Sequence, residues 1–161
     1  MPEPLIPDPA CAWFVVRLEA FPTKLATLLD GLTPDDMERR GPAAQWSARE
    51  QLAHLGRYHE VFLERLRRMR TEDAPRLPRY RTEEDPGFAA WTALEEPALR
   101  EALLARRQEL VEAVRGMPAA ELGRVGVHPV YGAMPLARWL EFFFAHEGHH
   151  LYVALLRARG G

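Results

Sequence analysis

The sequence predicts an all-α four-helix bundle, and three observations lead to this fold class. Four stretches of roughly 20 to 28 residues carry apolar side chains at helical intervals, and Pro- and Gly-rich loops separate them. Strand patterns are scarce, since only residues 124–131 look extended. With 47% apolar residues in 161, the chain can bury one core. We therefore expect a single domain over residues 1–161, opening with a proline-rich leader at 1–9.

The first helix is expected over about residues 10–30, where apolar side chains recur every three or four positions. Gly31 and Pro34 close it. Pro22 lies inside this stretch, and its ring removes a backbone hydrogen-bond donor. The sequence therefore predicts a kink, or a late helix start, at this point.

The second helix begins after Ser47, because Ser47 and Glu50 have the spacing of a capping box. It ends before the proline-containing loop at 73–86. Its apolar stripe consists of Leu52, Leu55, Tyr58, Phe62, Leu66 and Met69. His54 lies on the flank of this stripe, whereas His59 is turned roughly 140° away. We expect His59 to face solvent or to pack beside Leu63.

The third helix should cover roughly residues 87–115 and is expected to divide near its start at Pro97. Gly116 and Pro118 then stop it. The fourth helix follows, with Pro135 well placed in its first turn. On this last helix Trp139, Phe143, His146, His150 and Val153 share one strip. Glu147 lies about 100° around the helix from His146.

Charge and cysteine content exclude several functional classes. A net charge of −2 and a pI near 6.3 give no electrostatic argument for nucleic acid or an anionic membrane as partner. Cys11 is the only cysteine, which excludes an internal disulfide and suggests a buried thiol. No apolar run reaches membrane-spanning length. We expect a cytoplasmic protein that acts on a small molecule.

The segment His146-Glu147-Gly148-His149-His150 carries the chemistry. Side chains four residues apart on a helix lie one above the other, so His146 and His150 are placed to ligate one metal ion. The pattern reads HExxH, but residues 151–161 contain no third ligand of the kind that zinc proteases use. A third protein ligand must come from upstream, and His54 is the candidate. From spacing alone, two core histidines satisfied by hydrogen bonds fit as well.

Several motifs in order resemble the DinB/YfiT-like superfamily. They are Trp46 to Glu50 followed by His54-Leu55, then His128 to Gly132, then Trp139-Leu140 with His146 and His150. The resemblance spans about residues 10–158 and implies a four-helix bundle with His54, His146 and His150 as ligands of a divalent metal, usually zinc or nickel. It also implies a homodimer. Several members act as thiol S-transferases or isomerases that depend on bacillithiol, mycothiol or glutathione.

The leading hypothesis is therefore a metal-dependent transferase that joins a low-molecular-weight thiol to a small electrophile. Three neutral imidazoles would leave coordination positions open for substrate. Glu147 is the candidate catalytic acid or base, and Tyr58, Trp46 and His128 are candidates for substrate contact. Two alternatives stay open: a non-catalytic metal- or ligand-binding bundle that acts in a stress response, and a metal-dependent hydrolase with Glu147 as base.

Overall fold

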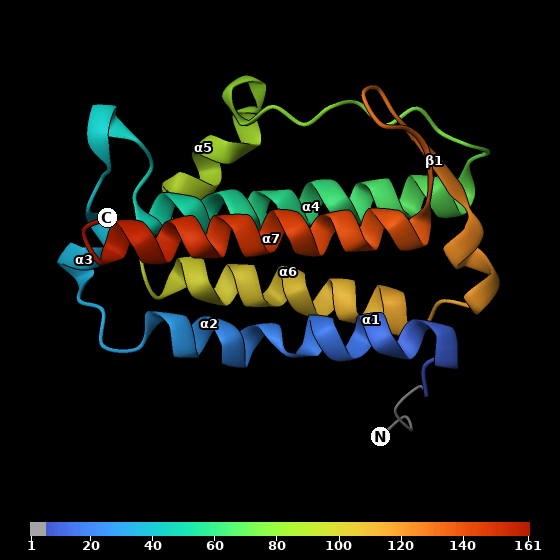
Figure 1. The fold of residues 1–161 in the computed structure, drawn as a ribbon, viewed down its shortest axis with the longest axis horizontal. Coiled ribbons are helices and arrows are strands. Elements are labelled where there is room, and N and C mark those ends of the chain that lie inside the picture. Colours follow the sequence, from blue (N-terminus) through green and yellow to red (C-terminus); the bar gives the residue numbers. More distant parts are fainter. Residues whose placement is uncertain (1–5) are drawn as a thin grey trace.

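Four helical rods make up the bundle in the computed structural model, which describes residues 6–161 (Figure 1). The first rod consists of α1 (Pro9–Glu19) and α2 (Phe21–Leu29), and the other three are α4 (Ala48–Thr71), α6 (Ala98–Arg115) and α7 (Leu136–Ala158). α4 packs against α7 and α6, and α1 packs against α6. The predicted fold class is confirmed. Among the described residues, none of the helices combines the length and the apolar character that crossing a bilayer requires.

Prolines divide two of the predicted helices where the sequence suggested. The first breaks at Ala20, and Pro22 lies in the first turn of α2, where its missing N–H costs no helical hydrogen bond. The third divides into α5 (Pro86–Thr92) and α6, with Pro97 at the N-cap of α6. Short helices α3 (Pro34–Glu38), η1 (Pro42–Ala44), η2 (Thr82–Glu84) and η3 (Ala119–Gly123) connect the rods.

The capping box at the start of α4 is present in full. The backbone N–H of Glu50 donates to the Ser47 hydroxyl, and the Glu50 carboxylate accepts from the Ser47 N–H at 2.8 Å. These two hydrogen bonds satisfy donors that a helix start would otherwise leave free. They fix the register of α4 one turn before His54.

A β-hairpin precedes α7. Strand β1 (Val125–His128) pairs antiparallel with β2 (Gly132–Pro135). The expected extended segment contains β1, but β2 was not predicted. Pro135 is the N-cap of α7, so placing it inside the first helical turn was wrong by one position. Backbone hydrogen bonds from Val127 to Pro75 and from Leu77 to Val127 attach the chain after α4 to this hairpin.

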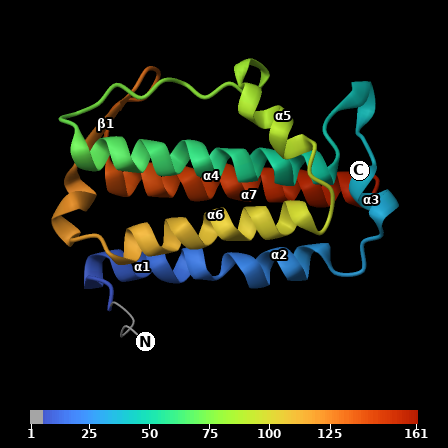
Figure 2. The ribbon, with the colours of Figure 1, turned by 180° about the vertical axis from the view of Figure 1, so that it is seen from behind.

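α4 and α6 run in the same direction, as the colour order in Figures 1 and 2 shows. Parallel neighbours need a long return connection, and here residues 72–97 travel back along the outside of α4. We call residues 73–85 of this connection the strap. The strap and the hairpin together cover the side of the bundle formed by α4 and α7, and this places them over the histidines.

Candidate metal centre

His54 of α4 and His146 and His150 of α7 converge on one point. One ring nitrogen from each of the three lies within 4.8 Å of the others, and the Nε2 atoms of His54 and His146 are 3.0 Å apart. The pairing of α4 with α7 brings together residues separated by 92 positions. The structure thus assembles the three predicted ligands, although metal binding itself stays a prediction.

Two polar side chains orient the imidazoles from behind. Nδ1 of His150 donates to the amide oxygen of Gln51 at 2.7 Å, and Nδ1 of His54 lies 3.1 Å from the hydroxyl of Thr82 in the strap. The amide oxygen of Gln51 can only accept, so it fixes the proton of His150 on Nδ1 and leaves Nε2 free to ligate a metal. The Thr82 hydroxyl holds the His54 ring in place and can donate or accept. The arrangement is therefore that of metal ligands with supporting partners.

All three rings are held neutral at physiological pH. Burial lowers the pKa of His54 to about 4. Burial first, and then the neighbouring histidines, lower the pKa of His150 to about 3 and of His146 to about 2. A ring that carries no proton keeps its lone pair for a cation. At neutral pH a metal would therefore compete with almost no protons for these sites.

The donor set fits a divalent metal. Two Nε2 lone pairs 3.0 Å apart repel each other unless a proton or a cation lies between them. Tetrahedral zinc with bonds of about 2.0–2.1 Å brings two nitrogens to roughly this separation. Nδ1 of His146 is buried and has no hydrogen-bond partner, so it does not fix the tautomer. Within residues 6–161, no carboxylate or thiol joins the group.

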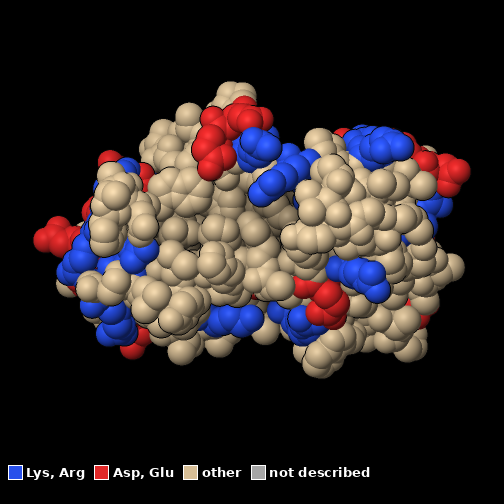
Figure 3. Space-filling view, turned by 45° about the horizontal axis from the view of Figure 1, so that its top comes forward, with Lys and Arg blue, Asp and Glu red and all other residues tan. Residues whose placement is uncertain are grey.

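The three histidines form the floor of a cavity of about 700 Å³ between α4, α7, the strap and the hairpin. Figure 3 turns this face of the molecule forward and shows a mostly uncharged middle, with charged side chains of both signs above it, below it and towards the sides. The three candidates for substrate contact, Trp46, Tyr58 and His128, all lie in the cavity wall, and contact with a substrate stays a prediction. The ring of Tyr58 stacks on the ring of His146 with centroids 3.8 Å apart. The ring centroids of Trp46 and His54 are 5.3 Å apart.

His128 lines the cavity and also stabilises the turn of the β-hairpin. Its Nδ1 accepts hydrogen bonds from the backbone N–H groups of Val130 and Tyr131 and so stabilises the hairpin turn. Its ring stacks on Tyr131 at 4.7 Å. The remaining nitrogen, Nε2, therefore carries the proton and is the atom that could donate to a ligand.

Glu147 does not line this cavity. Its carboxylate is 2% exposed and forms an ion pair with Arg107 of α6, in the core. The helical turn of about 100° from His146 directs Glu147 towards α6 instead of towards the cavity. The hypothesis that Glu147 is a base beside a metal is therefore corrected: the structure pairs it with Arg107 and places it neither in the cavity wall nor in the histidine group.

His59 also differs from expectation, because it is fully buried and not solvent-facing. Its Nδ1 donates to the Leu55 carbonyl at 2.7 Å, and Phe143 packs edge-on against the ring.

Sequence patterns also failed to single out Gln51, Thr82 and Arg65. Gln51, Tyr58 and Arg65 are spaced by seven on α4, and this spacing is the signal that could have found two of them.

Comparison with known proteins shows the fold and the family of this chain. YuaE of Bacillus subtilis (strain 168), an uncharacterized protein, is 25% identical over 136 residues, which is 76% of this chain and 83% of that protein. The structure of YfiT from Bacillus subtilis, described as a probable metal-dependent hydrolase with an unusual four-helix bundle topology, superposes with a TM-score of 0.72 and 20% identity, covering 99% of this chain and 93% of that one. The sequence profile of the DinB superfamily matches residues 17–154. The chain belongs to the DinB superfamily.

Proposed function

We propose that this protein is a metal-dependent enzyme that joins a small thiol to a small electrophilic substrate. The observation that carries the proposal is the set of three neutral imidazoles on the floor of an open cavity, with no carboxylate or thiolate of the described chain among the grouped ligand atoms. Three protein ligands leave room for a reactant in the coordination sphere, which is typical of reactive sites and not of structural ones.

A divalent metal held by His54, His146 and His150 would keep a bound thiol ionised at neutral pH, so that its sulfur is a nucleophile. In the transfer, a carbon–sulfur bond forms while the bond to the leaving group breaks, and the thiol proton goes to solvent. The chain's own residues exclude water and orient the reactants. Trp46 and Tyr58 supply flat apolar walls, and the Nε2–H of His128 is a donor in the same cavity.

The histidine group itself contains no carboxylate, and this favours thiol transfer. The one acidic residue in the cavity wall, Glu83, is exposed. A thiol ionised by a bound metal would need no base, whereas activation of water usually employs one. Glu147, the one acidic residue in the HExxH segment, is occupied by Arg107. Metal-dependent hydrolysis is the second candidate function, because YfiT is described as a probable metal-dependent hydrolase. A hydrolase built on this chain would have to activate water without Glu147.

The metal site is tested first on untagged protein. We expect about one zinc or nickel ion per chain by elemental mass spectrometry, lost in His150→Ala and retained in His149→Ala. His149 is the matched control, because it is the adjacent histidine on α7 and is exposed. If protein loaded with zinc or nickel holds no metal, or if both variants lose it equally, the proposal is wrong.

The reaction class is then tested by thiol dependence. Metal-loaded protein is given 1-chloro-2,4-dinitrobenzene with glutathione, bacillithiol or mycothiol, and separately an activated ester without thiol. Transfer that requires both metal and thiol supports the transferase. Ester hydrolysis that is independent of thiol supports the hydrolase. Bound metal with neither activity would leave a non-catalytic binding protein.

A further inference from the structure

Arg65 of α4 is a buried cation without an acidic partner. Its residue surface is 5% exposed, and its guanidinium donates only to neutral acceptors, the Tyr58 hydroxyl at 3.2 Å and the Pro78 carbonyl at 2.8 Å. No carboxylate of the described residues lies within 4 Å of it. A buried charge is costly unless it is paired with an opposite one, so Arg65 retains an unmet preference for an anion.

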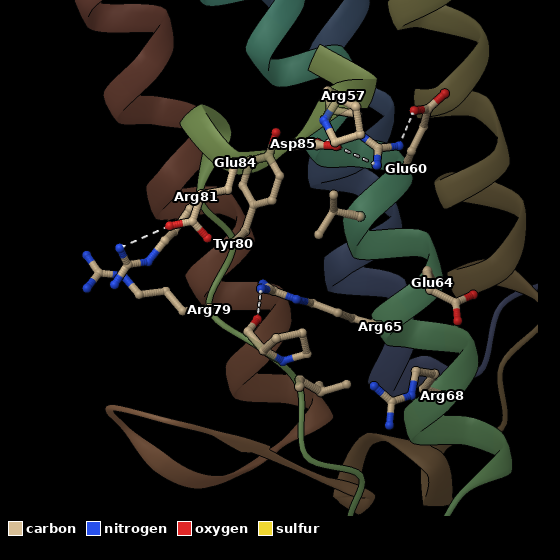
Figure 4. A pocket seen from close by; sticks show the side chains of 14 residues that line it. Arg57, Glu60, Glu64, Arg65, Arg68, Arg79, Tyr80, Arg81, Glu84 and Asp85 are labelled. Carbon is tan, nitrogen blue, oxygen red and sulfur yellow. Dashed lines mark hydrogen bonds and ion pairs between the residues drawn. The ribbon is translucent and has the colours of Figure 1, made fainter. Parts of the chain in front are cut away.

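Arg65 reaches into the cavity of the candidate metal centre. It lines that cavity and also a second hollow of about 560 Å³ on the outer side of the strap. In Figure 4 the side chain crosses from α4 to the strap, and Arg79 projects from the other side of the strap, away from Arg65. Arg79 lines both hollows too, and it forms no ion pair within the described chain.

The acidic side chains of the outer hollow do not neutralise these two arginines, because each has a partner of its own. Asp85 and Glu60 pair with Arg57. Glu84 pairs with Arg81, and Glu64 pairs with Arg67. On the side of the metal centre the one acidic residue in the wall is Glu83, which is exposed. The cavity therefore keeps a surplus of positive charge. Burial lowers the pKa of His128, and the charges of Arg65 and Arg79 add to this effect.

Tyr58 connects this cation to the histidines. Its hydroxyl accepts from Arg65, and its ring stacks on His146. The guanidinium and the metal-ligating nitrogens are thus about one tyrosine side chain apart. A ligand only a few bonds long could place an anionic group on Arg65 and a sulfur or oxygen atom at the histidines.

We infer that Arg65 is the anchor for a carboxylate of the ligand that enters the histidine cavity, so that the substrate class of this protein is small carboxylic acids. A planar guanidinium matches a carboxylate in a two-bond geometry that a lysine cannot reproduce. Arg79 at the rim adds attraction without fixing the orientation. The inference deepens the proposed function and rests on it for the reaction, but not for anion binding.

Anion binding is tested without metal. The metal-free protein is titrated with succinate and followed by nuclear magnetic resonance of backbone amides. We expect Arg65→Gln to weaken binding at least tenfold, and Arg65→Lys to weaken it less. Arg68→Gln is the matched control, because Arg68 also comes from α4 and donates to a strap carbonyl, that of Arg76, but is paired with Glu72. Equal affinity in wild type and Arg65→Gln would overturn the inference.

A second measurement separates an anchoring role from simple support of the strap. Cobalt-loaded protein is titrated with 3-mercaptopropionate and with 2-mercaptoethanol, which is neutral, and the thiolate-to-cobalt absorption band is recorded. The inference requires Arg65→Gln to weaken binding of the acid and to leave the neutral thiol unchanged. An equal loss for both thiols would mean that Arg65 only holds the strap. If no cobalt binds, the proposed reaction fails, while the succinate titration still decides the role of Arg65.

Discussion

The amide oxygen of Gln51 lies 2.7 Å from Nδ1 of His150 and accepts its proton. Gln51 belongs to α4, whose start is fixed by the capping box of Ser47 and Glu50, so the position of the acceptor is set by the register of that helix. This contact decides which nitrogen of His150 faces the other two histidines. Its loss should therefore affect the metal more than the fold.

We expect Gln51→Leu to weaken zinc affinity by about 10- to 100-fold, the effect typical of losing a hydrogen-bond partner of a metal-ligating histidine. Gln51→Glu, which keeps an acceptor oxygen, should stay within a few-fold of wild type. A competition titration with a chromophoric chelator measures both. Unchanged affinity in Gln51→Leu would show that the contact does not orient His150.

Glu147 should stabilise the fold and take no part in the chemistry. Glu147→Gln leaves the buried Arg107 without a counter-charge, which costs about 3–5 kcal/mol when one partner of a buried pair is removed. Glu141→Gln is the control, because Glu141 is half exposed in its pair with Arg17 and such pairs contribute about 0–1 kcal/mol. Urea unfolding gives both values. A Glu147→Gln protein with normal stability but no activity would contradict this role.

Acidification should destabilise the metal-free protein between about pH 6.5 and pH 4. Burial lowers the pKa of His54, His59, His146 and His150 to about 4, 3, 2 and 3 respectively. The unfolded chain binds protons at these groups below about pH 6.5, whereas the folded chain does not. The stabilisation is therefore fully present above pH 6.5 and is lost as pH falls towards the folded values.

Urea unfolding at pH 7, 6 and 5 measures this proton uptake as the slope of the unfolding free energy against pH. His150→Gln should lower the slope by about one proton, since it removes one of the four groups. A flat profile over this range would mean that the four rings are protonated in the folded protein.

Alanine substitutions at two glycines, one on α4 and one on α7, should change the stability of the protein in opposite directions. A Cβ on Gly148 meets nothing within 4 Å, so Gly148→Ala should stabilise α7 by up to about 1 kcal/mol without altering metal content. A Cβ on Gly56 would lie 2.1 Å from the ring of Trp91, and Gly56→Ala should cost about 1–3 kcal/mol through overpacking. Thermal unfolding compares the two; a stabilised Gly56→Ala would show that α5 moves freely away from α4.

The parts of the fold that the sequence could predict depend on local chemistry. Ser47 and Glu50 cap α4 through contacts three residues apart, and Pro22 and Pro97 break helices by removing an N–H. The pairing of His146 with His150 likewise follows from one helical turn. Each of these signals lies within a few residues of its effect, so no knowledge of packing is needed.

Features that depend on packing partners were not predictable in this way. Arg107 lies in a charged stretch that resembles a solvated face, yet it is 1% exposed because α6 contacts several neighbours at once. Glu147 is paired with Arg107, so its structural role could not be predicted without knowing that Arg107 is buried. Thr82 reaches His54 only because the strap returns over α4, and the pattern of residues 73–86 alone does not reveal that return.

The parallel orientation of α4 and α6 has an evolutionary consequence. α4 has 24 residues, so about 36 Å separate its two ends, and any chain joining it to a parallel neighbour must travel that distance outside the bundle. In this chain the return path passes over the histidines, where the Thr82 hydroxyl lies 3.1 Å from Nδ1 of His54. Insertions, deletions and substitutions in the strap reshape the entrance to the cavity, while the three histidines stay on α4 and α7. Specificity can thus change in one tolerant segment without disturbing the floor of the cavity.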